Sequence, residues 1–135
     1  MIDTEGDHPG QINRLKKGRD AAYPDLPTAV GVAHPCIEAW LLTDRKAIAR
    51  AMSLNSLAEA PPEHPEDLPA PHPDWVKSPK GTLARCAGRV KPLASKETTA
   101  IALHLHLETA RTGCPKSFAP FAAEVETRIR PIFAG

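Results

Sequence analysis

The chain has 135 residues and a mass of 14.5 kDa, which is the size of one domain with a buried core. Its 17 basic and 16 acidic residues give a formal net charge of +1, so charge neither requires nor excludes a polyanionic partner. The three cysteines lack CxxC spacing and no apolar run reaches the roughly 18 residues that cross a bilayer, so we expect a soluble, cytoplasmic protein with reduced thiols and no membrane partner.

The N-terminal quarter predicts a strand, a helix and a second strand. Residues 1–5 resemble the end of a buried strand, and residues 6–10 have the glycine and proline of a turn. Residues 11–22 have the spacing of a short amphipathic helix. Residues 28–33 are apolar, β-branched and bounded by prolines, as in a buried strand. This βαβ unit predicts parallel pairing with a right-handed crossover, and therefore an α/β protein.

Acidic residues gather where the first strand ends. Asp3 and Glu5 are two residues apart, so on an extended strand their carboxylates point to one face, and Asp7 follows in the turn. Open α/β sheets bind ligands at the carboxyl ends of their strands, and Mg²⁺ prefers oxygen ligands. The cluster therefore indicates a metal site, and the alternative is a solvated, frayed terminus.

Two helices are expected between Cys36 and Met52, because apolar residues recur there at helical spacing. Thr43 or Asp44 is suited to cap the second of them. Glu38 opens the first helix, where the positive end of the helix dipole stabilises a carboxylate. Glu38 is therefore either a helix-capping acid or a third carboxylate for the metal.

The next segment, residues 53–79, contains seven prolines and is expected to lack regular structure and to be either mobile or wrapped against the surface as an extended flap. A helix is expected to start at Ser78 and Pro79 and to continue to Arg89, because proline is favoured at the first helical position.

Basic residues occur at both ends of this helix and near it. Residues Lys77, Lys80 and Lys96 are candidates to hold a phosphate backbone, and solvated helix faces explain them equally well.

Residues 100–108 are ambiguous, because leucine or isoleucine alternates with other residues as in a strand while the flanks have helical composition. On a strand, His104 and His106 would face the same way and could bind a transition metal, although no third ligand has a suitable spacing. Residues 117–133 place apolar side chains on one face and predict an amphipathic helix.

Three blocks of the sequence resemble a family of uncharacterised bacterial proteins that has a Toprim-like fold and is related to the OLD-type nucleases. They are residues 2–7, residues 37–44 and residues 114–118 with the following Phe121. The resemblance implies one Toprim-like α/β domain over residues 1–135, with a short parallel sheet flanked by helices and a mostly helical C-terminal half. It also favours two short helices, with a polar cap near His106, over the strand alternative.

Toprim domains are associated with Mg²⁺-dependent strand cleavage or rejoining, and use a glutamate after the first strand and a DxD-type pair after a later one. Asp3 and Glu5 match the pair loosely, and the first-strand glutamate has no counterpart. The chain therefore looks like a family member that lacks its first strand and helix. The resemblance implies Asp3 and Glu5, with Asp7 as a possible substitute, as ligands of Mg²⁺ or Mn²⁺. With Glu38 added as an assisting carboxylate, the predicted catalytic residues are Asp3, Glu5 and Glu38.

The leading hypothesis is thus a Mg²⁺-dependent nuclease that acts on nucleic-acid phosphodiesters, in phage defence or DNA repair. The alternative is a non-catalytic interaction subunit or an inactive, truncated remnant. In that case the open sheet edge would pair with another chain, either a second copy or a partner protein.

Overall fold

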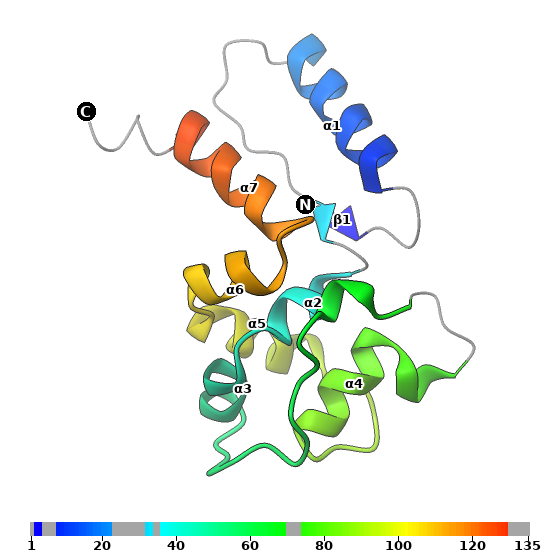
Figure 1. The fold of residues 1–135 in the computed structure, drawn as a ribbon, viewed down its shortest axis with the longest axis vertical. Helices are drawn as coiled ribbons and strands as arrows, with labels where there is room; N and C mark the ends of the chain where they lie inside the picture. Colours follow the sequence, from blue (N-terminus) through cyan, green and yellow to red (C-terminus); the bar gives the residue numbers. More distant parts are fainter. Residues whose placement is uncertain (1, 4–7, 23–31, 34–35, 70–73, 130–135) are drawn as a thin grey trace.

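The computed structural model describes residues 2–3, 8–22, 32–33, 36–69 and 74–129, and helices dominate it (Figure 1). In chain order the elements are β1 (Ile2–Asp3), α1 (His8–Ala22), β2 (Val32–Ala33), α2 (Ile37–Leu41), α3 (Arg45–Ala51), the 3₁₀ helices η1 (Pro65–Asp67) and η2 (Trp75–Lys77), α4 (Pro79–Cys86), α5 (Ser95–His104), α6 (Leu107–Gly113), α7 (Phe118–Glu124) and the π-helical turn η3 (Val125–Ile129). No helix in the described ranges combines the length and the apolar character that crossing a membrane requires.

The predicted Toprim-like α/β fold is wrong. In the described part of the chain, β structure is limited to β1 and β2, which pair in parallel with Ile2 opposite Val32 and Asp3 opposite Ala33. A parallel sheet that organises a domain needs several strands of about 5–6 residues with helices on both faces. Two strands of two residues each cannot supply that surface, and the packing is carried by helices instead.

The larger of two core clusters joins α2, α3, α4 and α5. Its fully buried members are Leu41, Leu42, Ala47, Ile48, Leu83, Cys86, Ala87 and Ile101. Asp44 fixes the start of α3, because its carboxylate accepts a hydrogen bond from the Ala47 amide at 3.1 Å. Ser78 does the same for α4 by accepting from the Gly81 amide at 3.2 Å, with Pro79 at the first helical position. Both helix starts lie where the sequence predicts them.

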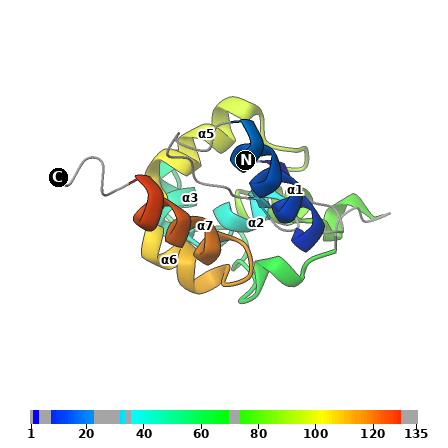
Figure 2. The same ribbon diagram turned by 90° about the horizontal axis from the view of Figure 1, so that it is seen from above.

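The second core cluster lies between α2, α6 and α7. Trp40, Ala110, Cys114 and Phe118 are buried there, and Ile37, Leu105, Phe121 and Ala122 pack against them. Trp40 belongs to this cluster and its neighbour Leu41 to the first, so α2 is shared by both. Figure 2 shows α2 near the centre of the molecule, with α3, α5, α6 and α7 around it.

α1 lies beside α7 at one end of the molecule (Figure 1). Glu124 of α7 forms ion pairs with Lys16 and Arg19 of α1. The Arg19 guanidinium is 3.1 Å from the Glu124 carboxylate, and the Lys16 ammonium is 3.4 Å from it. The predicted helix over residues 117–133 is described from Phe118 to Ile129, and its last turn is π-helical.

The ambiguous residues 100–108 are helical. α5 ends at His104 and α6 begins at Leu107, with Leu105 and His106 as the break between them. Leu103 is 81% exposed and Leu107 is 64% exposed, so the alternating leucines do not mark one buried face. The strand interpretation fails because only Ile101 of the alternating residues is fully buried.

Over their described part, the proline-rich residues 53–79 match the wrapped alternative and differ from it in two short 3₁₀ helices. They contain η1 and η2, and Pro65 and Glu66 are buried. Leu57 and Leu68 pack against the larger core cluster. The segment therefore wraps against the helices instead of projecting from them.

Gly81 in α4 packs directly against the backbone of η2, with no room for a side chain. A Cβ atom placed there would overlap the carbonyl group of Trp75 and lie 2.9 Å from the Cα of Val76. We expect Gly81→Ala to lower the free energy of unfolding by about 1–3 kcal/mol, because backbone atoms must move to relieve the overlap. Urea denaturation followed by circular dichroism measures this change.

Gly18 in α1 provides the matched control, because no atom lies within 4 Å of the Cβ that a substitution would add there. Gly18→Ala is expected to raise stability by about 0.5–1 kcal/mol through helix propensity. If both substitutions had the same sign, the contact at Gly81 would not be what distinguishes them.

Candidate functional site

A cavity of about 220 Å³ lies where the first turns of α2, α4 and α5 meet, and Glu38 lines it. Its lining consists of Glu38, Lys80, Leu83, Pro92, Leu93, Ser95 and Thr98. One carboxylate oxygen of Glu38, Oε2, is shielded from solvent and has no hydrogen-bond partner among the described residues. Such an oxygen is costly to bury, so the Glu38 side chain, which lines the cavity, has an unmet preference for a cation or a hydrogen-bond donor.

The walls of this cavity are held by specific contacts at the start of α5. Glu97 accepts a hydrogen bond from the Ala94 amide at 3.0 Å through Oε1. Its other oxygen pairs with the Arg89 guanidinium at 3.0 Å. These contacts tie the first turn of α5 to the segment that follows α4, and so hold Ser95 and Thr98 at the cavity.

The three predicted lysines lie on the elements around the cavity. Lys80, in the first turn of α4, lines it together with Glu38. Lys77 ends η2, three residues before Lys80, and Lys96 is the second residue of α5, next to Ser95. Both are exposed and do not line the cavity. The structure therefore brings Glu38 and Lys80 together and places the other two lysines on adjacent segments.

The acidic cluster is only partly within the described structure. Glu5 and Asp7 lie outside the described residues, and Asp3 is described only as a member of β1. The backbone of Asp3 lies opposite Ala33, five residues before Glu38. Within the described ranges, no three histidine, cysteine or acidic side chains are grouped closely enough to hold a metal ion. The joint metal site of Asp3, Glu5 and Asp7 stays a prediction.

Sequence reasoning missed a buried polar network around Glu66, which is only 5% exposed. The Ser117 hydroxyl donates to Glu66 Oε2 at 2.6 Å, and the Lys116 amide donates to Oε1 at 2.9 Å. The indole N–H of Trp40 donates in turn to the Ser117 oxygen at 2.7 Å. No local pattern in residues 53–79 indicates this role, since the partners of Glu66 are about 50 positions away in the chain.

The three cysteines are buried, and within the described residues they form no disulfide bond. Burial, with a smaller contribution from Glu66, raises the pKa of the Cys114 thiol, and burial followed by Glu59 raises that of Cys86. A raised pKa keeps a thiol protonated, and the protonated form is a weak nucleophile. Cys86 and Cys114 therefore serve the core, and the Cys114 thiol lies 3.5 Å from the Ala39 carbonyl oxygen.

Comparison of the chain with protein-family models, with curated proteins and with solved structures found no match.

The chemistry that the cavity can support follows from its lining. A carboxylate oxygen without a partner is suited to a hard cation, and a neighbouring ammonium group is suited to an anion. The Ser95 hydroxyl adds a hydrogen-bond donor, whereas the Thr98 hydroxyl already donates to the Ser95 carbonyl oxygen at 3.0 Å. A cation and an anion that bind side by side, such as Mg²⁺ with a phosphate group, would satisfy all of these groups together.

Proposed function

We propose that the chain is a Mg²⁺-dependent hydrolase of nucleic-acid phosphodiesters and that the cavity at Glu38 is part of its site. The observation that carries this proposal is that Glu38, whose shielded Oε2 has no partner among the described residues, lines one cavity with Lys80. Proteins commonly bind Mg²⁺ through one or two carboxylates while substrate phosphates and water complete the coordination. The donor set of the cavity fits that pattern.

Each lining group has a proposed role. Glu38 holds the cation, Lys80 pairs with a phosphate oxygen, and the hydroxyl of Ser95 orients the phosphate by hydrogen bonding. When bound, Mg²⁺ neutralises charge on phosphate oxygens as a Lewis acid. Lys77 and Lys96 would contact the nucleic-acid backbone on either side of the cavity.

The acidic N-terminal residues enter this proposal as further carboxylates. Asp3 lies in β1 and pairs with β2, the strand that precedes α2. This backbone position supports a site that Asp3 shares with Glu38. Glu5 and Asp7 follow it in the sequence as additional ligands. The similarity of the block around Glu38 to proteins related to OLD-type nucleases supports a cytoplasmic role in phage defence or DNA repair.

The test is cleavage of single-stranded and double-stranded DNA with Mg²⁺ or Mn²⁺. We expect Glu38→Gln to reduce the rate at least tenfold, because the amide keeps the shape but loses the charge that binds the cation. Glu63→Gln is the matched control, because Glu63 is exposed and has no ion pair within the described residues. Its rate should equal that of the wild type.

Asp3→Ala tests the N-terminal carboxylates in the same assay. Equal rates for wild type and Asp3→Ala would remove Asp3 from the site. Cleavage that survives unchanged in Glu38→Gln, or that is absent in the wild type with both metals, would contradict the proposed function.

The second candidate is an interaction subunit, and the short β1–β2 pair favours it. In the described residues these strands bond only to each other, so each has an edge on which another strand could add. Size-exclusion chromatography with light scattering distinguishes the two candidates. An obligate dimer without cleavage activity supports the interaction subunit, and an active monomer rejects it.

A further inference from the structure

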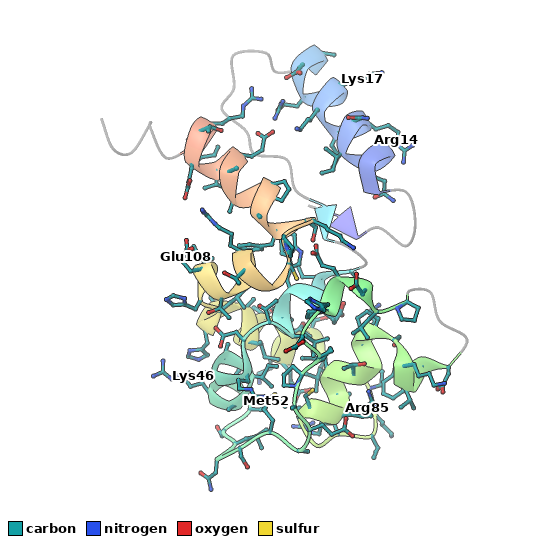
Figure 3. All side chains as sticks on the ribbon, viewed as in Figure 1. Arg14, Lys17, Lys46, Met52, Arg85 and Glu108 are labelled. Atoms are coloured by element: carbon teal, nitrogen blue, oxygen red, sulfur yellow. The ribbon has the colours of Figure 1, made fainter. Side chains whose placement is uncertain are left out.

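A second and larger cavity, of about 620 Å³, lies between α3 and the corner where α5 meets α6. α3 contributes Lys46 and Arg50 to its lining, and the corner contributes His104 and His106. Lys46 extends from α3 on the side of the molecule where Glu108 also lies (Figure 3). The two histidines that the sequence singles out are therefore brought to one cavity, together with two cationic side chains.

The cationic groups of this cavity are not neutralised within the described residues. Lys46 and Arg50 are one helical turn apart on α3, and neither forms an ion pair there. Arg85, Arg89 and Arg111, by contrast, each pair with a glutamate. A concave surface with unpaired positive charge raises the local concentration of anions.

Asp44 is the acidic side chain in the lining, and its oxygens are already engaged. Oδ1 accepts from the Ala47 amide at 3.1 Å, and Oδ2 accepts from the His106 amide at 2.9 Å. Asp44 is only 7% exposed, so little of its carboxylate faces the cavity. Its main role is to stabilise the start of α3 and the break before α6. The exposed polar groups that remain to meet a ligand are Lys46, Arg50, the two imidazoles and the Thr109 hydroxyl, which lies 3.5 Å from Nδ1 of His106.

This lining disfavours a metal ion and favours an anion. A transition metal would need a third ligand beside the two histidines, and Lys46 and Arg50 would repel it. Phosphate, in contrast, suits an arginine, a lysine and imidazole N–H donors. Leu54 adds an apolar wall, and the volume is within the range of about 300–1,000 Å³ that small-molecule sites occupy.

We propose that this cavity binds a phosphorylated small molecule of nucleotide size, with the phosphate groups held by Lys46, Arg50 and the two histidines and the apolar part against Leu54. The site is separate from the cavity at Glu38. Ser95 and Thr98 line that cavity at the first turn of α5, whereas His104 ends the helix. Ligand binding here therefore does not depend on the proposed nuclease activity.

Isothermal titration calorimetry of the full chain with ADP and with inorganic pyrophosphate tests the proposal. We expect the Lys46→Gln, Arg50→Gln double variant to bind both probes at least tenfold more weakly than the wild type. Arg45→Gln is the matched control, because Arg45 is an exposed cation of the same helix that does not line this cavity. Its affinity should stay within twofold of the wild type.

Two further variants make the outcome specific. Leu54→Ala should weaken ADP at least threefold and leave pyrophosphate unchanged, because only ADP carries an apolar part. Glu38→Gln should bind both probes like the wild type, so a failure of the nuclease proposal leaves this result intact. Circular dichroism verifies that each variant is folded.

Three outcomes would overturn the site. They are no binding of either probe by the wild type, equal affinity in the double variant, and an equal loss in Arg45→Gln, which would indicate general attraction to a basic surface. Displacement of ADP by short single-stranded DNA with the same dependence on Lys46 and Arg50 would assign the cavity to nucleic acid instead and would also overturn the proposal.

Discussion

Glu66→Ala is expected to lower the free energy of unfolding by about 3 kcal/mol, because it leaves one buried and one partly buried donor without an acceptor. The donors are the Lys116 amide and the Ser117 hydroxyl, at 2.9 and 2.6 Å from the carboxylate. The substitution also removes the buried polar attachment of η1 to the turn between α6 and α7 and leaves the exposed Asp67–Lys116 ion pair. Urea denaturation monitored by circular dichroism gives the change directly.

The neighbouring acid provides a matched control for this prediction. Asp67 pairs with the Lys116 ammonium at 3.0 Å, but both side chains are about 60% exposed. Asp67→Asn should therefore cost less than about 1 kcal/mol, as is usual for a surface ion pair. A Glu66→Ala effect no larger than that of Asp67→Asn would mean that water replaces the carboxylate at little cost.

Trp40→Ala is expected to destabilise the chain by about 3–5 kcal/mol, the range for loss of a large buried aromatic side chain. The indole ring is 4.9 Å from the ring of Phe118 in an edge-to-face arrangement and 5.7 Å from that of Phe121 in a stacked one. Its removal leaves a cavity between α2, α6 and α7 and leaves the Ser117 oxygen without its donor. Thermal unfolding followed by circular dichroism measures the loss.

Trp40→Phe separates the two contributions, because it keeps an aromatic ring and removes the N–H group. We expect about 1–2 kcal/mol from this change, most of it from the lost hydrogen bond to Ser117. Val90→Ala serves as the control for a hydrophobic truncation at the surface, since Val90 is 90% exposed, and it should have almost no effect. Similar losses for Trp40→Ala and Val90→Ala would exclude Trp40 as a centre of the core.

Local signals in the sequence predicted the helix starts well, because caps act over three or four residues. Asp44 and Ser78 both cap the helices expected of them, and the aromatic face of residues 117–129 packs as its spacing indicates. The sheet was the main error. An apolar, β-branched run such as residues 28–33 suits a buried strand, but a sheet also needs partner strands, and a pattern within one run cannot reveal whether they exist.

The candidate site was predicted in the same uneven way. Glu38 and Lys80 were both named from the sequence and line one cavity, whereas the common site of Asp3, Glu5 and Asp7 is untested by the described residues. The alternation of His104 and His106 with leucines suggested one strand face. The two histidines do reach one cavity, but they do so because the chain breaks between α5 and α6. The role of Glu66 depends on contacts too distant in the chain for any local pattern.

The five-residue helix α2 supplies neighbouring side chains to both core clusters, Trp40 to one and Leu41 to the other. A helix this short has almost no stability of its own, so it persists only while both sides are packed against it. If either core cluster is disrupted, α2 loses its packing and the other cluster is weakened. We therefore expect residues 36–52 and the C-terminal helices to unfold in a single cooperative transition. Glu38 lies on this same helix, so the position of the proposed catalytic carboxylate depends on intact packing in both core clusters.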